Sequence, residues 1–195
     1  MSQNELAEYL RDRGILKSEA IIKAFEEVDR ADFVRPEFKD NPYGDYPLSI
    51  GQGQTISQPT TVAFMISLLS PKLGEKVLDV GAGSGWTTAL LAKLVGSAGK
   101  VFGTEIIFDL VQFGKKNLAK YNLNNAEIVR AGEELGLPSE APFDKILVSA
   151  AARDLPQELV AQLKVGGRLV LPIKNSVWLI EKTSEDKIEK QEFPG

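Results

Sequence analysis

Apolar residues recur at near-helical spacing through the first 30 residues of the chain. Leu6 and Leu10 belong to a first apolar stripe, which Gly14 interrupts. A second stripe predicts one helix over residues 20–28, and Ser18 stands where that helix would begin. The N-terminal part of the chain is therefore predicted to be helical, with one apolar side.

From residue 60 onward, strand patterns alternate with helical patterns. Short apolar runs predict strands over residues 76–80, 100–105, 126–130, 143–149 and 168–173. Helical spacing predicts helices over residues 60–69, 87–95, 109–121 and 156–163. Two last strands, over residues 177–182 and 187–193, would pair as a hairpin around residues 184–186. This alternation predicts an α/β fold with a doubly wound, mostly parallel sheet of seven strands.

Residues 31–59 differ from both flanking regions. They are rich in proline, glycine and polar residues and show little periodicity, which predicts a long structured loop. Long loops inside compact domains tend to be functional. We therefore expect a single domain over residues 1–195, with a helical and loop extension over residues 1–59 and a cofactor-binding core over residues 60–195.

The composition limits the chemistry. The 195-residue chain has no cysteine and no histidine, so it offers no disulfide, no thiol nucleophile and no imidazole base, and we expect no metal site. Lys and Arg total 23 against 27 Asp and Glu, a net charge of −4 that argues against a nucleic-acid partner. No apolar run reaches the roughly 18–20 residues of a membrane span, and the N-terminus is not signal-like. We therefore expect a cytoplasmic protein with no membrane partner.

The strongest local signal is a glycine-rich turn after the predicted strand over residues 76–80. Gly81, Gly83 and Gly85 precede a predicted helix, and glycines there let the backbone turn tightly and approach a ligand. Glu105 ends the next predicted strand, where a carboxylate can accept both hydroxyls of a ribose. Dinucleotides and S-adenosylmethionine both fit this order of strand, turn, helix and acid.

The spacing of the glycines distinguishes the two cofactor classes. A dinucleotide site carries G-x-G-x-x-G, but Trp86 occupies the position of the third glycine. Asp79 stands two residues before Gly81, and this combination resembles the first motif of the class I methyltransferases. Any tight turn between a strand and a helix can use glycines, so a purely structural role stays open for this motif taken alone.

A segment before the glycine turn carries a more specific resemblance. Residues 43–59, YGDYPLSIGQGQTISQP, are similar to the signature of the protein-L-isoaspartate O-methyltransferases. Other similar segments are RADFV at 30–34, APFD at 141–144, AAA at 150–152 and QLKVGGRLV at 162–170. These matches follow the order of the family over roughly residues 20–173, which is most of the chain.

The resemblance implies a Rossmann-like class I S-adenosylmethionine-dependent methyltransferase. The implied reaction moves a methyl group from S-adenosylmethionine to the free α-carboxylate of L-isoaspartyl residues in damaged proteins and leaves S-adenosyl-L-homocysteine. The ester then collapses to a succinimide, which reopens partly to normal aspartate. The implied partners are isoaspartyl peptides and proteins, and we expect the chain to act as a monomer.

The resemblance also implies the residues of the site. Cofactor contacts are expected from Gln54, Thr55, Ile56, Ser57, Asp79, Gly81, Gly83, Ser84, Gly85, Glu105, Ile106, Gly132 and Glu133. Substrate contacts are expected from Ile56, Ser57, Gln58, Ala151 and Ala152. Ser57 matches the serine usually treated as catalytic, and we expect its hydroxyl to donate to the acceptor carboxylate or the cofactor.

Simpler structural roles compete with some of these assignments. Ser57 would also be an ordinary cap for a helix that begins near Pro59, and Thr55 has the same two interpretations. Tyr43 and Asp45 would simply fasten the loop by turn hydrogen bonds.

The proposed chemistry suits a chain without histidine or cysteine. A carboxylate with a reference pKa of about 4 is already ionised at neutral pH, so it needs no general base to act as a nucleophile. The methyl sulfonium is already activated. The protein must then supply alignment and a site that excludes water.

Three features depart from the family's pattern. Gly132, Glu133 and Glu134 replace the usual Gly-Asp-Gly, although Glu133 can still accept from the adenine amino group. Arg153 stands where a proline is common, either near the substrate or as a solvated surface residue. Family members generally extend beyond the position of Gly195, and part of that tail helps cover the site.

Four other functions stay open. The same fold would serve a methyltransferase with another acceptor, or a cofactor-binding relative that has lost turnover. A nucleic-acid methyltransferase acting on amino groups would carry an Asn/Asp-Pro-Pro-aromatic motif where this chain has Ser149 and three alanines. The triplet Asn-Pro-Tyr at 41–43 lies elsewhere and lacks the second proline. A dinucleotide oxidoreductase is disfavoured by the glycine spacing.

Overall fold

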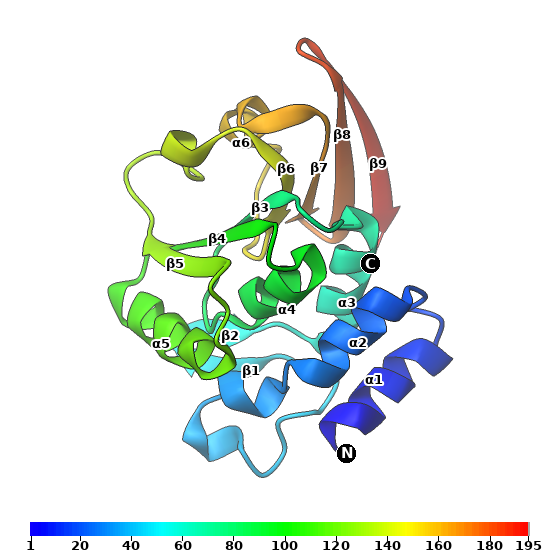
Figure 1. The fold of residues 1–195 in the computed structure, drawn as a ribbon, viewed down its shortest axis with the longest axis vertical. Helices are drawn as coiled ribbons and strands as arrows, with labels where there is room; N and C mark the ends of the chain where they lie inside the picture. The colour runs from blue at the N-terminus through cyan, green and yellow to red at the C-terminus, as the bar shows by residue number, and fades with distance from the viewer. Residues whose placement is uncertain (195) are drawn as a thin grey trace.

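One twisted sheet of seven strands organises the chain (Figure 1). The structure is a computed structural model that describes residues 1–194. The strand order is β5-β4-β3-β6-β7-β8-β9. The strands are β3 (Lys76–Val80), β4 (Lys100–Glu105), β5 (Ala126–Arg130), β6 (Phe143–Val148), β7 (Leu163–Ile173), β8 (Ser176–Ser184) and β9 (Lys187–Pro194). All pairs from β5 to β7 are parallel, and β8 and β9 add an antiparallel edge. The chain order reverses at β3, which is where open α/β sheets bind ligands.

The two faces of the sheet are covered unequally. One face packs against α3 (Pro59–Leu69), α4 (Trp86–Val95) and α5 (Phe108–Leu118), and the N-terminal helices α1 (Gln3–Asp12) and α2 (Glu19–Glu27) join the same core. Within residues 1–194, the other face is covered by the short helix α6 (Gln157–Ala161) and the turn η4 (Pro138–Glu140). The first face therefore contains most of the buried apolar side chains.

Aromatic rings complete the thinner face. Phe102 and Phe143 meet edge to face with centroids 6.2 Å apart. The ammonium group of Lys76 lies 5.4 Å from each ring centroid, so its aliphatic stem covers apolar surface while its charge stays near solvent.

The N-terminal extension is part of the main core. Phe25 of α2 packs edge to face on Trp86, the first residue of α4, with centroids 5.6 Å apart. Phe33, in the 3-10 turn η1 (Arg30–Phe33), stacks on Tyr121 beyond α5. The side-chain amide of Gln3 accepts from the Arg30 backbone N–H at 3.0 Å, which ties α1 to η1. The extension thus reaches the sheet core through α4 and α5.

The structure confirms the α/β fold and corrects several predicted boundaries. Residues 31–59 contain a hairpin of β1 (Leu48–Gly51) and β2 (Gln54–Ile56), as well as η1 and the turn η2 (Pro36–Phe38). The helix predicted over residues 156–163 ends at Ala161, because Leu163 already pairs with Phe143 as the first residue of β7. The helix predicted to reach residue 121 ends at Leu118, and η3 (Ala119–Tyr121) follows. No helix in residues 1–194 combines the length and apolar character needed to cross a membrane.

Candidate active site

A cavity of about 570 Å³ lies at the carboxyl ends of the central strands. This volume is in the usual range for small-molecule sites. Its wall comes from the ends of β3, β4, β5 and β6 and from the β1–β2 hairpin. Ten of the predicted site residues line it, namely Gln54, Thr55, Ser57, Gly81, Gly83, Glu105, Ile106, Gly132, Glu133 and Ala151. Segments far apart in the sequence therefore meet at the place where the fold predicts a ligand.

The glycine turn leaves room that side chains would fill. Gly81 has φ +85°, and a Cβ atom there would lie 3.0 Å from the Cβ of Ala150 on the neighbouring strand end. Gly83 has φ +51°, and its Cβ would lie 3.1 Å from Cδ1 of Ile50 in the hairpin. Both positions combine a left-handed backbone with a close approach, which only glycine accommodates without strain. The turn is thus shaped to bring main chain, without side chains, against a ligand.

The carboxylate of Glu105 is fixed at the edge of the cavity. Its Oε2 accepts from the Gly83 N–H at 3.0 Å, and its Oε1 accepts from the Ile107 N–H at 2.9 Å. Each oxygen keeps a further lone pair, so the group can still accept from ligand hydroxyls. A carboxylate oriented by main-chain donors beside a glycine turn fits the ribose of a nucleoside cofactor.

Asp79 lies behind the glycine turn rather than on the cavity wall. It is fully buried and accepts from the hydroxyls of Thr88 and Ser149, each at 2.7 Å. Burial raises the pKa of Asp79 to about 6, against the lowering effect of these two hydrogen bonds. The side chain joins β3, α4 and the end of β6, so its position supports a structural role beneath the turn.

The β1–β2 hairpin forms the roof of the cavity. Its turn has positive φ at Gly51, Gln52 and Gly53. Arg35 Nε donates to the Ile50 carbonyl at 2.7 Å, and its guanidinium stacks 4.3 Å from the ring centroid of Phe113. These contacts hold the hairpin to α5 and so above the cavity.

Ser57 lies on the cavity wall, where it is half-buried. The prediction that it caps the following helix is wrong. Gln58 is the N-cap residue of α3, and Asp45 satisfies the first turn instead, accepting from the Thr60 N–H at 2.9 Å and the Thr60 hydroxyl at 2.8 Å. The Ser57 hydroxyl is thus not used to cap α3.

Tyr43 and Asp45 fasten the loop as predicted, but through contacts with distant residues rather than through turn hydrogen bonds. Tyr43 donates its hydroxyl to Asp29 at 3.0 Å, and burial raises the pKa of Tyr43 to about 12. Burial acts against ionisation of Asp45, but hydrogen bonds from Thr60 prevail and lower the pKa of this carboxyl. The Gln58 side chain donates to the Asp45 carbonyl at 3.0 Å. These contacts fasten residues 43–46 to Asp29 and to the start of α3.

Six predicted site residues do not line the cavity: Ile56, Gln58, Asp79, Ser84, Gly85 and Ala152. Ile56, the last residue of β2, is buried in the main core, whereas Gln54 and Thr55 before it line the cavity. Ser84 is buried, and Gly85 forms the N-cap of α4. The Ala152 N–H donates to the Pro172 carbonyl at 3.0 Å, which turns the chain away toward β7.

Sequence reasoning missed several residues of the wall. The missed side chains include Ile50, Thr104, Ile107, Glu134, Leu135 and Ser149. Thr104 and Ser149 lie at the carboxyl ends of parallel strands, and Ile107, Glu134 and Leu135 lie in the loops that follow such ends, so the rule that ligands sit at carboxyl ends points to them. Ile50 had no such signal, because its hairpin was predicted as loop.

The charged side chains on the wall are all acidic. They are Glu105, Glu133 and Glu134, and neither lysine nor arginine is among the lining residues. Arg153, a departure from the family pattern, is exposed and does not line the cavity. An anionic ligand at this site must therefore be held by hydroxyls and main-chain N–H groups, or by a positive charge on a second ligand.

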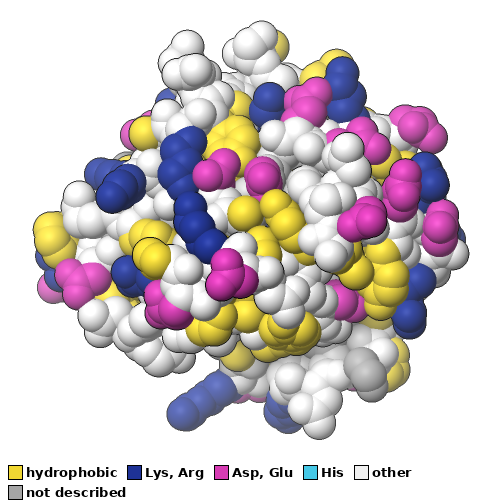
Figure 2. All heavy atoms as spheres, turned by 90° about the horizontal axis from the view of Figure 1, so that it is seen from below, with side chains coloured by type: hydrophobic (Ala, Val, Ile, Leu, Met, Phe, Trp, Pro, Cys, Tyr) yellow, Lys and Arg dark blue, Asp and Glu magenta, His cyan; other side chains and the backbone are white. Residues whose placement is uncertain are grey.

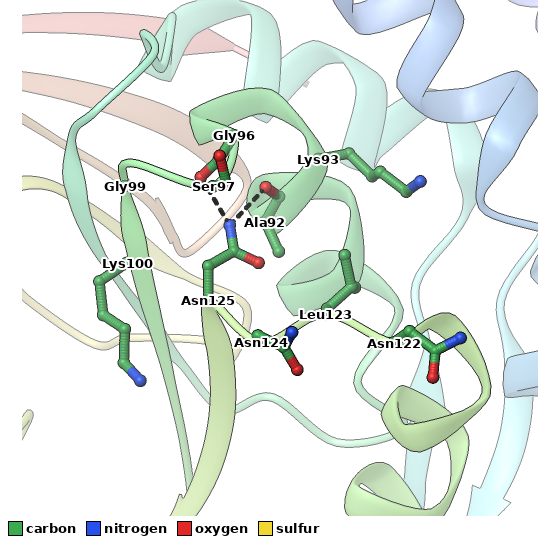
Figure 3. Close-up of a pocket in the computed structure, with 10 residues that line it drawn as sticks. All are labelled: Ala92, Lys93, Gly96, Ser97, Gly99, Lys100, Asn122, Leu123, Asn124 and Asn125. Atoms are coloured by element: carbon green, nitrogen blue, oxygen red, sulfur yellow. Dashed lines mark hydrogen bonds between the residues drawn. The ribbon is translucent and has the colours of Figure 1, made fainter.

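A second hollow, of about 420 Å³, lies at the opposite ends of the strands (Figure 3). It is next to Lys100, which begins β4, and Asn125, which precedes β5. Asn125 donates to the carbonyls of Ala92 and Gly96 at 2.9 and 2.8 Å, as the dashed lines show. No predicted site residue lines this hollow, and its central amide serves to close the end of α4.

Comparisons with known proteins agree with this geometry. The family model for protein-L-isoaspartate(D-aspartate) O-methyltransferase matches residues 1–193. A relative from Methanopyrus kandleri named protein-L-isoaspartate O-methyltransferase is 41% identical over 100% of this chain and 88% of its own length. One from Anaeromyxobacter dehalogenans with the same name is 48% identical over 87% of this chain and 79% of its own.

A solved structure extends the agreement to three dimensions. A putative protein-L-isoaspartate O-methyltransferase from Plasmodium falciparum, in complex with S-adenosyl-L-homocysteine, superimposes with a TM-score of 0.87 at 29% identity. The match covers 100% of this chain and 96% of that one. The family model, the relatives and the fold point the same way, and the chain belongs to the protein-L-isoaspartate(D-aspartate) O-methyltransferase family.

Proposed function

We propose that the chain methylates the free α-carboxylate of L-isoaspartyl residues in damaged proteins, and that Ser57 orients this carboxylate in the reaction. The observation that carries the proposal is that Ser57 shares one cavity with the glycine turn and Glu105. The family's reaction needs an acceptor group and a nucleoside cofactor side by side, and this cavity offers a group for each.

The cofactor is S-adenosylmethionine, which supplies a methyl group already activated on a sulfonium. Glu105 would accept from the ribose hydroxyls, and Glu133 would accept from the adenine amino group. Ile106 is 70% exposed and lines the cavity, so it offers apolar surface to the adenine ring. Gly81 and Gly83 would bring main chain against the cofactor. Asp79 would act from behind, by holding the turn in place.

The acceptor side has only to position a carboxylate. Because the acceptor is ionised at neutral pH, Ser57 is not needed as a base and would donate its hydroxyl to one carboxylate oxygen. Ala150 and Ala151, both on the wall, are small enough to let a peptide backbone approach. The acidic lining gives no ion pair to the acceptor, so hydrogen-bond geometry would select it.

The setting of this reaction follows from composition and surface. We propose a cytoplasmic monomer that does not bind nucleic acid. The net charge of −4 argues against nucleic-acid binding, and Figure 2 shows Lys and Arg interspersed with Asp and Glu on the face it displays. Light scattering during gel filtration would test the monomer, since a mass near twice 21.3 kDa would contradict it.

Methyl transfer to a synthetic isoaspartyl peptide tests the proposed function. We expect base-labile label from tritiated S-adenosylmethionine on the isoaspartyl peptide and none on the matching aspartyl peptide. Label on neither peptide, with cofactor binding confirmed by calorimetry, would point to another acceptor or a lost activity. Glu133 and Glu134, which replace the family's Asp-Gly on this wall, would then be the first residues to change back.

The Ser57→Ala variant tests the assigned role. Removing a hydrogen bond to a charged group costs about 1.5–3 kcal/mol, so we expect kcat to fall by roughly 10- to 100-fold. The dissociation constant of S-adenosylmethionine should change by less than about threefold, because Glu105 and the glycine turn are untouched. Ser97→Ala, far from the cavity, is the matched control. Equal losses in turnover and cofactor affinity would refute the role.

A further inference from the structure

The guanidinium of Arg30 lies behind the acceptor side of the cavity. Its side chain is 0% exposed. Nη1 donates to the carbonyls of Pro42 and Gly44, the latter at 3.4 Å. Nη2 donates to the carbonyl of Tyr46 at 3.1 Å and to that of Ser57 at 3.1 Å. One buried side chain thus joins the loop over residues 42–46 to the main chain of the candidate catalytic serine.

Burying the Arg30 guanidinium costs free energy in the folded chain. Within residues 1–194, no carboxylate lies within salt-bridge distance of Arg30, and its Nε is buried with no hydrogen-bond partner. Burial lowers the pKa of Arg30 to about 10. An unpaired buried charge costs free energy, and only the hydrogen bonds from the guanidinium to the four carbonyls offset this cost. A reason for an arginine here must therefore come from the geometry it imposes on its four carbonyl partners.

Arg30 also touches the cofactor side. Its Cζ lies 5.4 Å from the ring centroid of Trp86, which directly follows the last glycine of the turn. The Trp86 indole N–H in turn donates to the Val28 carbonyl at 3.4 Å, two residues before Arg30. The guanidinium therefore contacts the main chain of Ser57 on one side and the first residue of α4 on the other.

We propose that Arg30 is a positioning residue that sets the Ser57 hydroxyl against the cofactor side of the cavity. It acts through the Ser57 carbonyl and the Trp86 ring, and the inference rests on the role proposed for Ser57. The planar guanidinium donates hydrogen bonds in a fixed fork geometry and also packs its face on an aromatic ring. It can therefore fix the Ser57 carbonyl and the Trp86 ring relative to each other. A lysine would keep the charge and donate to carbonyls, but it would lose the fork and the stacking geometry.

The Arg30→Lys variant tests the proposal by separating turnover from cofactor binding. Small displacements of a reacting group can cost up to about 100-fold in rate, so we expect kcat to fall by roughly 10- to 100-fold. The dissociation constant of S-adenosylmethionine, from calorimetry, should change by less than about threefold. Arg168→Lys is the matched control, because Arg168 also donates to a distant carbonyl, that of Leu68 at 3.2 Å. Its kcat should stay within about twofold of wild type.

A double-mutant cycle with Ser57→Ala then identifies the route of the effect. If Arg30 acts through Ser57, Arg30→Lys should lower kcat by less than about threefold in the Ser57→Ala background. An equal fold-loss in both backgrounds would overturn the proposal and leave the role of Ser57 intact. If Ser57→Ala itself leaves kcat unchanged, both the role of Ser57 and this proposal fail.

Folding is checked separately by circular dichroism. If Arg30→Lys does not fold, Arg30→Gln, which keeps a neutral donor on a shorter side chain, replaces it in the cycle. Loss of the folded state in both variants would assign Arg30 to the fold alone and overturn the proposal.

Discussion

On the sheet side of the cavity, main-chain hydrogen bonds between strand ends form the wall. The Gly81 and Ala82 N–H groups both donate to the Thr104 carbonyl, at 2.8 and 2.9 Å, and the Ser149 N–H donates to the Val80 carbonyl at 2.8 Å. These bonds continue the parallel ladder beyond β3, β4 and β6. Their geometry is set by the sheet and depends little on particular side chains.

On the roof side, side chains from distant segments hold the wall. Arg35 fixes the Ile50 carbonyl, Asp45 fixes the start of α3, and Gln52 reaches Asp109 of α5 at 2.8 Å. The two strands of the hairpin contribute only four and three residues. Such short strands have little stability of their own and depend on these contacts.

The difference separates two kinds of sensitivity. The sheet side should tolerate most side-chain changes but fail when a Cβ atom enters the glycine turn. On the roof side, substitutions of exposed side chains should have little effect on cofactor binding and turnover. Loss of a buried polar contact should lower them.

Gly81→Val should abolish cofactor binding. Its Cβ would lie 3.0 Å from Ala150 at φ +85°, so strain and collision act together. Together they should lower the affinity for S-adenosylmethionine, measured by calorimetry, by at least about 100-fold. Gly14→Val is the matched control, since φ there is +70° but no atom lies within 4 Å of the added Cβ. Intact binding of S-adenosylmethionine by the Gly81 variant would show that the cofactor does not need close approach to the main chain of the glycine turn.

Asp79→Asn should change how stability depends on pH. The Asp79 carboxyl has a pKa of about 6 when folded, well above its ordinary value of about 4. Between these two values the folded chain holds a proton that the unfolded chain releases. Wild-type stability should therefore fall as pH rises through this range, by roughly 2–3 kcal/mol relative to the Asn variant.

Urea unfolding of both proteins from pH 4 to pH 7 measures this difference. Glu134→Gln, at an exposed position, serves as the control and should leave the pH dependence unchanged. Parallel curves for wild type and the Asn variant would contradict the buried state of this carboxyl.

Glu105→Gln should weaken cofactor binding without unfolding the glycine turn. The amide keeps one acceptor oxygen but cannot accept from both Gly83 and Ile107 and also from a ribose. We expect the free energy of S-adenosylmethionine binding to drop by about 1–3 kcal/mol. Glu127→Gln, which changes an exposed partner of Lys100, provides the control. An unchanged dissociation constant in the Glu105 variant would remove this residue from the cofactor site.

The same contrast explains what the sequence could predict. The strand, glycine turn and Glu105 lie within 30 consecutive residues, and local patterns report local structure well. The roof depends on pairs such as Arg35 with Ile50 and Gln52 with Asp109, which no periodicity encodes. The strands of the hairpin are too short for a period of two to emerge, so the sequence predicts a loop there.

Among the site residues, too, local patterns could be predicted and long-range contacts could not. Ser57 was found only through resemblance to a family signature, and its contact with Arg30 joins residues 27 apart in the chain. The resemblance predicts Ile56 in the site with its neighbours, but the structure buries this side chain in the main core. The place of Asp79 in the motif predicts a cofactor contact. Its burial indicates instead that this motif position supports the glycine turn from the side away from the cavity.

Gln52→Ala should have the smallest effect of the series. Gln52 is exposed at the tip of the hairpin, and its amide donates to Asp109 at 2.8 Å. An exposed hydrogen bond of this kind contributes about 0.5–1 kcal/mol, so cofactor affinity should fall by no more than roughly fivefold. Gln191→Ala, on the exposed face of β9, is the matched control. A loss beyond tenfold would mean that one surface contact keeps the roof in place. The roof would then depend on its surface contacts as much as on the buried contacts of Arg30 and Asp45.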